Sequence, residues 1–287
     1  MSSVPSDLSV QQPSPPENPK RVSVGNDVLD LQHPRCRHRE KGDRLPFRIL
    51  TEAEMEWWRA AGESGPRLRR LWALWAAKET TFKAVSKIEG QPPVFRHREF
   101  EASLRERIDG EVVRLEGTVV WRSHRCSVEG ISTPRFLHMV GWLPYPGHGQ
   151  ATGGSVGSST LSPAGREAPL LEVGIEGCSE GSGAAAGRWR GAGAALSRRV
   201  RELAAQRLAS HLRRTGVPVD SLGSEVPRIR IGRSLEGGIR RPPTVWVNDR
   251  ACREVDLSLS HHGRYVAWVL SLPECRGGPS DPEPASD

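Results

Sequence analysis

Hydrophobic and polar residues follow strand and helix periods in two regions of the chain, with a stretch poor in hydrophobic residues between them. In the first region, RVSVGNDVLDL at residues 21–31 predicts a buried strand, and Gly25 permits a close backbone approach near its middle. Residues 94–144 show further strand patterns, with a hairpin pair in GEVVRLEGTVVWRSHRCSVEG and one more strand in STPRFLHMVGWLP. The strands of this region therefore lie on both sides of residues 51–87 in the sequence.

Two helices are predicted between these strands. Thr51 and Glu54 form a capping box at the start of the first helix, whose sequence continues as EMEWWRAAG. The second helix runs from about residue 67 to 87, and Gly90 with the prolines that follow it ends the helical pattern.

The second helix places charged groups beside its apolar side. Trp75, Glu79 and Lys83 follow one another at four-residue steps, so their side chains lie one above the other. A carboxylate and an ammonium held on a rigid helix suit a site that binds a metal and a phosphate together. By itself, however, the pattern favours an amphipathic core helix with an ordinary salt bridge. A functional site requires partners for Glu79 and Lys83 from other segments.

The second region combines one helix with several strands. Residues 196–215 form an amphipathic helix with arginines on its polar faces, which are typical of a solvated surface but could also meet an acidic partner. RIRIGRS and GIRRPPTVWVND each contain a strand. VDLSLSHHGRYVAWVLSL predicts two strands joined by a polar corner at residues 260–263.

These patterns divide the chain into five segments. Residues 1–20 are rich in Pro, Ser and Gln and read as a disordered tail, and residues 274–287 form a second one. Residues 145–195 are dominated by Gly, Ala and Ser and read as a flexible insertion, within which LLEVGIE is a candidate short strand. The insertion separates the two parts of one folded domain, residues 21–144 and 196–273.

Composition narrows the classes of protein and of partner. The 287 residues carry a formal net charge of +7, which favours polyanionic partners such as nucleic acids, phosphorylated cofactors or acidic proteins. The five cysteines are widely spaced and form no CxxC pair, which argues against a disulfide framework or a thiolate zinc site. The N-terminus lacks signal-peptide features and no apolar run is long enough to span a bilayer, so we expect a soluble, cytoplasmic protein.

Three short stretches carry chemistry when they are taken together. They are GND at residues 25–27, WAAKETTFK at 75–83 and SLSHHG at 258–263. In this order they resemble the 4'-phosphopantetheinyl transferase superfamily, whose pattern is a G-x-D strand, a W-x-x-K-E-x-x-x-K helix and an S-x-S-H corner. Because the S-x-S-H element comes last, the chain is most similar to the holo-acyl-carrier-protein synthase type. The resemblance implies an α+β fold with an antiparallel sheet packed around a long central helix.

The resemblance also implies an activity and roles for particular residues. Such enzymes transfer the phosphopantetheine arm of coenzyme A to a serine of an apo carrier protein and release adenosine 3',5'-bisphosphate. Asp27 and Glu79 would hold Mg²⁺, and Lys83 would contact the diphosphate. Glu79, or a water on the metal, would take the serine proton. Ser260 and His261 would bind coenzyme A.

Other residues are weaker candidates, and the sequence departs from the family in two respects. Lys78 and Arg264 are secondary candidates for phosphate contact, and His262 would replace His261 if the motif were aligned one position later. Leu29 stands where two-lobed members often carry a third metal-binding carboxylate, which leaves Asp27 and Glu79 as the implied pair. The chain is also far longer than typical synthase-type members.

The expected partner is an acidic apo acyl or peptidyl carrier protein, toward which Arg35, Arg37 and Arg39 are candidate steering residues. The sequence does not distinguish fatty-acid, polyketide and peptide-synthase carriers, and it does not give the oligomeric state. The alternative from another class is a basic nucleic-acid-binding protein without catalytic activity, whose arginines and tryptophans contact phosphates and bases. That alternative offers no reason for Asp27 and Glu79 to converge.

Overall fold

The computed structural model describes residues 22–37, 44–90, 92–145, 171–178, 192–215, 227–233, 235–236 and 239–272. Both predicted tails lie outside the described residues, as do most of the predicted insertion and Arg39. The description below concerns the two regions of regular structure that these ranges contain.

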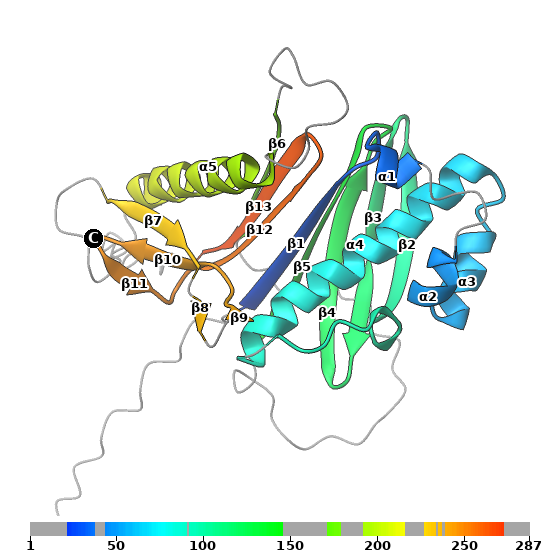
Figure 1. Ribbon diagram of the computed structural model, residues 1–287, viewed down its shortest axis with the longest axis horizontal. Coiled ribbons are helices and arrows are strands. Elements are labelled where there is room, and N and C mark those ends of the chain that lie inside the picture. The colour runs from blue at the N-terminus through cyan, green and yellow to red at the C-terminus, as the bar shows by residue number, and fades with distance from the viewer. Residues whose placement is uncertain are drawn as a thin grey trace, which may run out of the picture.

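The first region is an antiparallel sheet with a long helix across one face (Figure 1). Five of the described strands form this sheet in the order β1-β5-β4-β3-β2. Their bounds are β1 Val22–Asp30, β2 Glu101–Asp109, β3 Val112–Trp121, β4 His124–Ser132 and β5 Phe136–Pro144. The helical segments are α1 Pro34–Arg37, α2 Leu45–Ile49, α3 Glu52–Arg59, α4 Ser64–Ile88 and the 3-10 turn η1 His97–Glu99.

Helix α4 packs against β1 at a point where the two backbones approach closely. Gly25 of β1 pairs with Gly141 of β5, so two glycines lie side by side under the helix. A Cβ atom at Gly25 would lie 1.9 Å from the carbonyl oxygen of Thr80, and one at Gly141 would lie 2.8 Å from the Thr80 methyl group. Gly25 therefore permits the close backbone approach that the sequence predicted, and the middle of α4 packs against β1 at this point.

The start of α3 and the interior of α4 are tied together by a buried ion pair. Thr51 and Glu54 form the predicted capping box, with both of its reciprocal hydrogen bonds present. The second oxygen of the Glu54 carboxylate accepts from the N–H of Ala102, and Lys78 of α4 donates to Glu54 Oε2 at 2.7 Å. Helix α4 ends at Ile88 with Glu89 as its C-cap, and Gly90 follows with a positive φ of 68°. Charged groups thus fix α3 and α4 to the sheet.

The second region packs one helix against two small sheets. Helix α5 Ala192–Thr215 covers the sheet β12-β13-β6 and contacts β7 of the sheet β11-β10-β7. The strands are β6 Leu171–Gly177, β7 Ile229–Gly232, β8 Leu235–Glu236, β9 Ile239–Arg240, β10 Thr244–Val247, β11 Arg250–Cys252, β12 Asp256–His262 and β13 Tyr265–Ser271. Buried apolar residues from the helix and both sheets form a core of their own, separate from the core under α4. Strand β6 and the first turn of α5 lie within residues 145–195.

The two regions meet along one edge of β1, where side chains replace a neighbouring strand. Four alternate backbone N–H groups of β1 donate to four alternate side chains of β12, over distances between 2.7 and 3.1 Å. The pairs, in order, are Val24 with Asp256, Asn26 with Ser258, Val28 with Ser260 and Asp30 with His262. Because unpaired N–H groups on a buried strand edge are costly, this polar ladder both satisfies the edge and fixes the register of the two regions.

Lys87, at the C-terminal end of α4, completes the same joint. Its ammonium lies 2.9 Å from both carboxylate oxygens of Asp256 and donates to the backbone carbonyls of Val24 and Leu257. Helix α4, β1 and β12 are therefore held together at one point by a buried charge pair.

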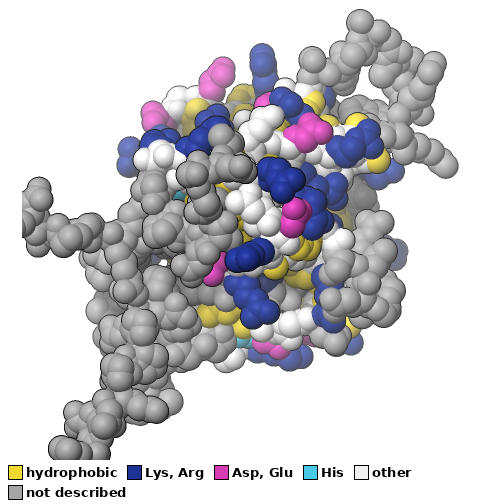
Figure 2. Space-filling view, turned by 90° about the vertical axis from the view of Figure 1, so that its left-hand side faces the viewer, with side chains coloured by type: hydrophobic (Ala, Val, Ile, Leu, Met, Phe, Trp, Pro, Cys, Tyr) yellow, Lys and Arg dark blue, Asp and Glu magenta, His cyan; other side chains and the backbone are white. Residues whose placement is uncertain are grey.

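The structure confirms the expected fold class, an antiparallel sheet packed around a long central helix. Figure 2 views the molecule from the side of α5, β7 and β10, and Lys and Arg side chains gather on this face with Asp and Glu scattered among them. Among the described residues, no helix is both long and apolar enough to cross a membrane.

Candidate functional site

A cavity of about 310 Å³ opens where α4, β1, β12 and α5 meet. Its lining includes all five residues to which the sequence assigns catalytic, cofactor-binding or metal-binding roles: Asp27, Glu79, Lys83, Ser260 and His261. The first region contributes three of them and the second region two, although the two groups lie far apart in the sequence. The structure thus brings the predicted residues together, while the role of each one stays a prediction.

Asp27 holds the two regions together at the floor of the cavity. Lys83 donates to Asp27 Oδ1 at 2.8 Å and to the carbonyl oxygen of Asn26 at 2.8 Å. The hydroxyl of Ser260 also donates to Asp27 Oδ1, at 2.9 Å, while its oxygen accepts from the N–H of Val28. Within the described residues, Asp27 Oδ2 accepts no hydrogen bond, so one oxygen of this carboxylate is left for another ligand.

Glu79 lines the same cavity, but its carboxyl group has different surroundings from that of Asp27. Burial raises the pKa of Glu79 to about 7, the nearby Asp27 carboxylate raises it further, and the Lys83 ammonium opposes both effects. In the part of the chain that the structure describes, no donor bonds the Glu79 carboxylate. A carboxyl group with a pKa near 7 can gain or lose a proton at neutral pH, which is the property that a general base or acid requires.

Asp27 and Glu79 form a donor set that fits a hard divalent cation. Both side chains line one cavity, and among the described residues neither Asp27 Oδ2 nor the half-buried Glu79 carboxylate has a hydrogen-bond donor. No cluster of three or more His, Cys, Asp or Glu ligands occurs in the described residues. Mg²⁺ favours a site with one or two carboxylates, in which water or phosphate oxygens take the remaining coordination positions.

Helix α4, β1, α5 and β12 supply apolar residues around these polar groups. Trp75 lies on the α4 side of the cavity, and its ring packs against His97 with centroids 4.4 Å apart and edge-on to Trp72 at 6.2 Å. The predicted row of Trp75, Glu79 and Lys83 therefore faces one site. The other apolar lining residues are Val28, Leu29, Val200 and Leu259.

His261 lies on the side of the cavity formed by α5. Its Nε2 is 2.9 Å from the hydroxyl of Ser197, the residue one turn before Arg201 on the same helix. Burial lowers the pKa of His261, and the positive charges of Lys83, Arg233 and Arg201 lower it further. The imidazole is therefore neutral near pH 7, in surroundings with a positive electrostatic potential.

Three of the polar lining residues were not predicted from the sequence: Ser197, Arg201 and Arg233. The arginines of residues 196–215 were interpreted as a solvated surface with a capacity for acidic partners, and that interpretation does not separate one arginine from the next. A usable signal was the four-residue spacing of Ser197 and Arg201 beside Val200, because this spacing places a polar pair next to the buried stripe.

Two secondary predictions are wrong because the side chains are already engaged. Lys78 is fully buried and donates to Glu54 and to the carbonyl oxygens of Ile49 and His97, so it cannot reach a ligand in the cavity. Its position one residue before Glu79 rotates it by about 100° around α4, toward the core.

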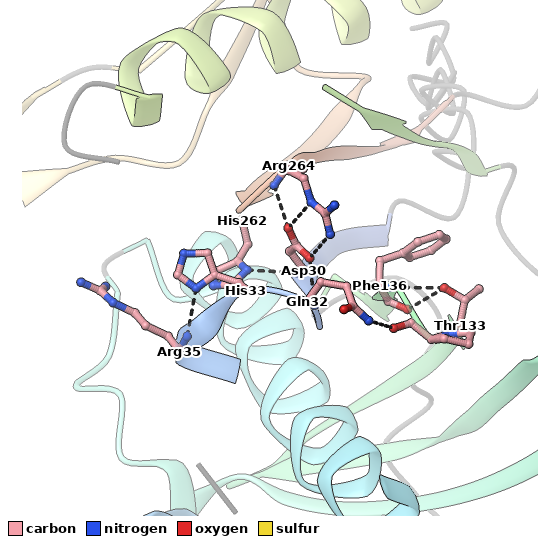
Figure 3. A network of polar contacts seen from close by, with 9 residues as sticks. Asp30, Gln32, His33, Arg35, Thr133, Phe136, His262 and Arg264 are labelled. Atoms are coloured by element: carbon pink, nitrogen blue, oxygen red, sulfur yellow. Dashed lines mark hydrogen bonds and ion pairs between the residues drawn. The ribbon is translucent and has the colours of Figure 1, made fainter. Parts of the chain in front are cut away.

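Arg264 belongs to a separate network at the end of β1 (Figure 3). Its guanidinium binds both oxygens of the buried Asp30 carboxylate, with Nε and Nη2 each 2.9 Å from an oxygen. His262 belongs to the same network, because its Nδ1 accepts a hydrogen bond from the N–H of Asp30 at 3.0 Å. His262 borders the cavity, but one ring nitrogen serves the joint between the two regions, whereas His261 faces the cavity with its polar edge bonded to Ser197.

Comparison with known proteins gives three results. Residues 23–130 match the family model of the 4'-phosphopantetheinyl transferase superfamily. A holo-[acyl-carrier-protein] synthase of Polaromonas sp. is 35% identical over 78 residues, which make up 26% of this chain and 59% of that protein. The crystal structure of a holo-[acyl-carrier-protein] synthase from Neisseria meningitidis aligns with 42% of this chain and 96% of its own, at 18% identity and a TM-score of 0.30. The sequence match thus covers less than two thirds of the curated relative.

Proposed function

Because residues 23–130 match the family model of the 4'-phosphopantetheinyl transferase superfamily, we propose that the protein transfers the phosphopantetheine arm of coenzyme A to a serine of an apo carrier protein. The observation that carries this proposal is the convergence of Asp27, Glu79, Lys83, Ser260 and His261 on one cavity. In the reaction, the serine oxygen forms a bond to the β-phosphorus of the diphosphate. The bond to the bridging oxygen breaks, and adenosine 3',5'-bisphosphate leaves.

The substrate diphosphate is anionic, so the site must supply positive charge without losing the carboxylates that organise it. Lys83 reaches the floor of the cavity from α4 and donates to Asp27 Oδ1 and to a backbone carbonyl. Its ammonium has a third donor position for a phosphate oxygen. As the leaving group separates, this ammonium stabilises the charge that accumulates on its phosphate.

Asp27 and Glu79 would hold the Mg²⁺ ion that the family implies. When bound there, Mg²⁺ would supply positive charge to the diphosphate oxygens. Ser260 orients Asp27 by donating to Oδ1, which directs the other carboxylate oxygen away from the Lys83 and Ser260 bonds. The Asp27 side chain is thus positioned before any ligand arrives.

Glu79 has the properties of the group that accepts the proton of the attacking serine. Its carboxyl is half-buried, lines the cavity and has a pKa of about 7. Near neutral pH a substantial fraction of molecules carries the ionised form, and that form is a stronger base than an ordinary exposed glutamate. Trp75 and the apolar lining residues limit the access of bulk water to this proton transfer.

The carrier protein would approach a strongly basic surface. Carrier proteins are acidic around the modified serine, and Arg35 and Arg37 are exposed on α1, immediately after β1. We therefore infer that an acyl or peptidyl carrier, of a fatty-acid, polyketide or peptide synthase, docks near the end of β1. The nucleic-acid-binding alternative leaves the convergence of Asp27, Glu79 and Lys83 on one cavity unexplained.

The test is to incubate the full chain with coenzyme A, Mg²⁺ and a panel of apo carriers of all three types, and to measure intact carrier mass. Addition of the phosphopantetheine mass to at least one carrier is expected. Absence of transfer to every member of a broad panel, together with steep salt-dependent binding to oligonucleotides, would overturn the proposal in favour of the alternative.

A further inference from the structure

A second pocket, of about 300 Å³, opens at the C-terminal end of α4, and no described residue lines both this pocket and the cavity above. Ser86, Lys87 and Gly90 line it from the first region, and parts of β10, β11 and β12 line it from the second. Its volume lies at the lower end of the range of about 300 to 1,000 Å³ that is typical of small-molecule sites. A small molecule in this pocket would therefore contact both regions of the chain.

The ion pair of Lys87 and Asp256 lines one side of this second pocket. An ammonium has three N–H donors. The contacts of Lys87 with Asp256 and with the carbonyl oxygens of Val24 and Leu257 account for them. The pair therefore adds no net charge to the second pocket and leaves no donor of Lys87 for a ligand.

Two arginines make the rest of the charged lining positive. Apart from the pair of Lys87 and Asp256, the charged residues of the described chain that line the second pocket are Arg241 and Arg253. Arg241 donates to the carbonyl oxygen of Gly90, which holds its guanidinium at the end of α4. Arg253 is exposed, and among the described residues no acceptor bonds its side chain. The second pocket therefore attracts anions.

The two glutamates that adjoin the lining residues in the sequence are bonded to other side chains. Glu89 Oε1 lies 2.7 Å from Nε2 of His124, and Glu254 accepts from the thiol of Cys252 at 3.2 Å. Neither glutamate lines the second pocket. An anion in this pocket would thus meet two guanidinium groups, and the one carboxylate in the described lining is already paired with Lys87.

The remaining wall of the second pocket is largely apolar. Its apolar side chains are those of Tyr145, Pro242, Pro243, Val245 and Val255. Sites for small organic ligands usually combine apolar walls with a few polar or charged groups that fix the orientation of the ligand. The lining thus suits a molecule that has an anionic group and a small apolar body.

We propose that the second pocket binds a small molecule with a phosphate or carboxylate group, and that Arg253 and Arg241 hold this group. A planar guanidinium can donate two parallel hydrogen bonds to either group. The ligand contacts both regions, so it binds their joined state and stabilises that state by mass action. Helix α4 leads from Lys87 to Lys83, and β12 leads from Asp256 to Ser260, so the ligand also favours the arrangement in which the cavity residues converge.

The test follows amide chemical shifts of the full chain by nuclear magnetic resonance during titration with inorganic phosphate and, separately, with citrate, at constant ionic strength. The amides of Gly90, Val245 and Cys252 should shift and saturate with at least one anion, with a dissociation constant of about 1 to 10 mM. Arg253→Gln should weaken this binding at least about threefold. Arg250→Gln is the matched control, because Arg250 is exposed on β11 and lines neither pocket, and it should bind like the wild type.

Three results would overturn the inference: no saturable shift of these amides with either anion, unchanged binding in Arg253→Gln, or an equal loss in Arg250→Gln. Saturation by phosphate alone would assign a phosphate ligand, and saturation by citrate alone a carboxylate ligand. Arg253 is exposed, so the fold should tolerate its substitution, and unchanged shifts elsewhere in the spectrum check this. The amide of Val28 reports anions in the first cavity separately, so failure of the proposed function and failure of this inference are distinguishable.

Discussion

The two carboxylates in the cavity, Asp27 and Glu79, differ in the hydrogen-bond donors around them. Asp27 receives two donors on a single oxygen, from Lys83 and Ser260, and is thereby held in one orientation. Glu79 is half-buried in the same cavity and receives no donor from the residues that the structure describes, and its pKa is raised to about 7. The difference supports the proposed roles, in which both carboxylates would hold the metal and Glu79 would also accept the serine proton.

The raised pKa of Glu79 predicts that this residue destabilises the fold above neutral pH. An unfolded glutamate with a pKa near 4.5 ionises more readily than the folded one, so stability from this group falls as pH rises from about 4.5 through 7. Glu79→Gln should therefore raise the free energy of unfolding at pH 8 by about 1 to 3 kcal/mol. It should have little effect at pH 4.5.

Denaturant unfolding of the variant and the wild type at both pH values measures this effect. Glu56→Gln is the control, because Glu56 is exposed on α3, and it should change stability by less than about 0.5 kcal/mol at either pH. A glutamine variant that is less stable than the wild type at pH 8 would show that Glu79 has a stabilising partner.

At the scale of elements, β1 is the strand on which the site depends. One face receives α4 over the glycine pair Gly25 and Gly141, and one edge receives the side chains of β12. Asp27 lies between these contacts, two residues after Gly25 and one before Val28, whose N–H binds Ser260. The spacing between the carboxylates of the two elements is therefore set by how closely α4 approaches β1.

Gly25→Ala should separate α4 from β1. The added methyl group would lie 1.9 Å from the Thr80 carbonyl oxygen, which is backbone and cannot rotate away, so the helix itself must shift. We expect a loss of about 1 to 3 kcal/mol of stability, as for overpacked cores, together with a loss of transfer activity.

Gly65→Ala is the matched control for this substitution. Gly65 lies in the first turn of α4, and nothing lies within 4 Å of a Cβ atom built there. Alanine at this position should leave activity unchanged and leave stability unchanged or increase it by up to about 1 kcal/mol. Wild-type stability and activity in Gly25→Ala would refute the close packing of α4 on β1.

The polar ladder between β1 and β12 makes a separate prediction. Ser258 is buried and accepts from the N–H of Asn26 at 3.1 Å, so Ser258→Ala leaves a buried donor unsatisfied. The expected cost is about 1 to 3 kcal/mol, with faster hydrogen exchange of the Asn26 amide. Ser210→Ala, at an exposed position of α5, should cost far less. Unchanged protection of Asn26 in the Ser258 variant would contradict the ladder.

At the scale of the whole molecule, both described regions line the cavity. The first region supplies the carboxylates and Lys83, and the second supplies Ser260, His261 and Arg201. The joint between the regions, from Lys87 and Asp256 to Asp30 and Arg264, therefore positions the site as well as stabilising the fold.

The sequence predicted the parts of this arrangement that local spacing determines. The four-residue steps of α4 placed Trp75, Glu79 and Lys83 on one face, and Gly25 marked the close approach. The contacts that depend on how distant segments meet could not be read locally. Lys78 looked available next to Glu79, yet its partner Glu54 lies in the preceding helix.

Ser260 and Arg201 illustrate the same limit of sequence reasoning. Ser260 was assigned to coenzyme A, whereas the structure shows its hydroxyl bonded to Asp27 and to the backbone of β1. Arg201 resembles the other arginines of its helix until α5 is packed against β12. The side-chain pairing of β1 with β12 likewise follows from tertiary register, which the alternation of polar residues in DLSLSHH does not specify.

The central claim is that Glu79 and its neighbours form a transferase site, and single-turnover transfer to an apo carrier tests it most directly. With saturating coenzyme A and Mg²⁺, intact-mass measurement should show the phosphopantetheine arm on the carrier with the wild type and with Glu56→Gln. Glu79→Gln, shown by its unfolding curve to be folded, should transfer at least about 100-fold more slowly. Transfer by Glu79→Gln at the wild-type rate would contradict the account.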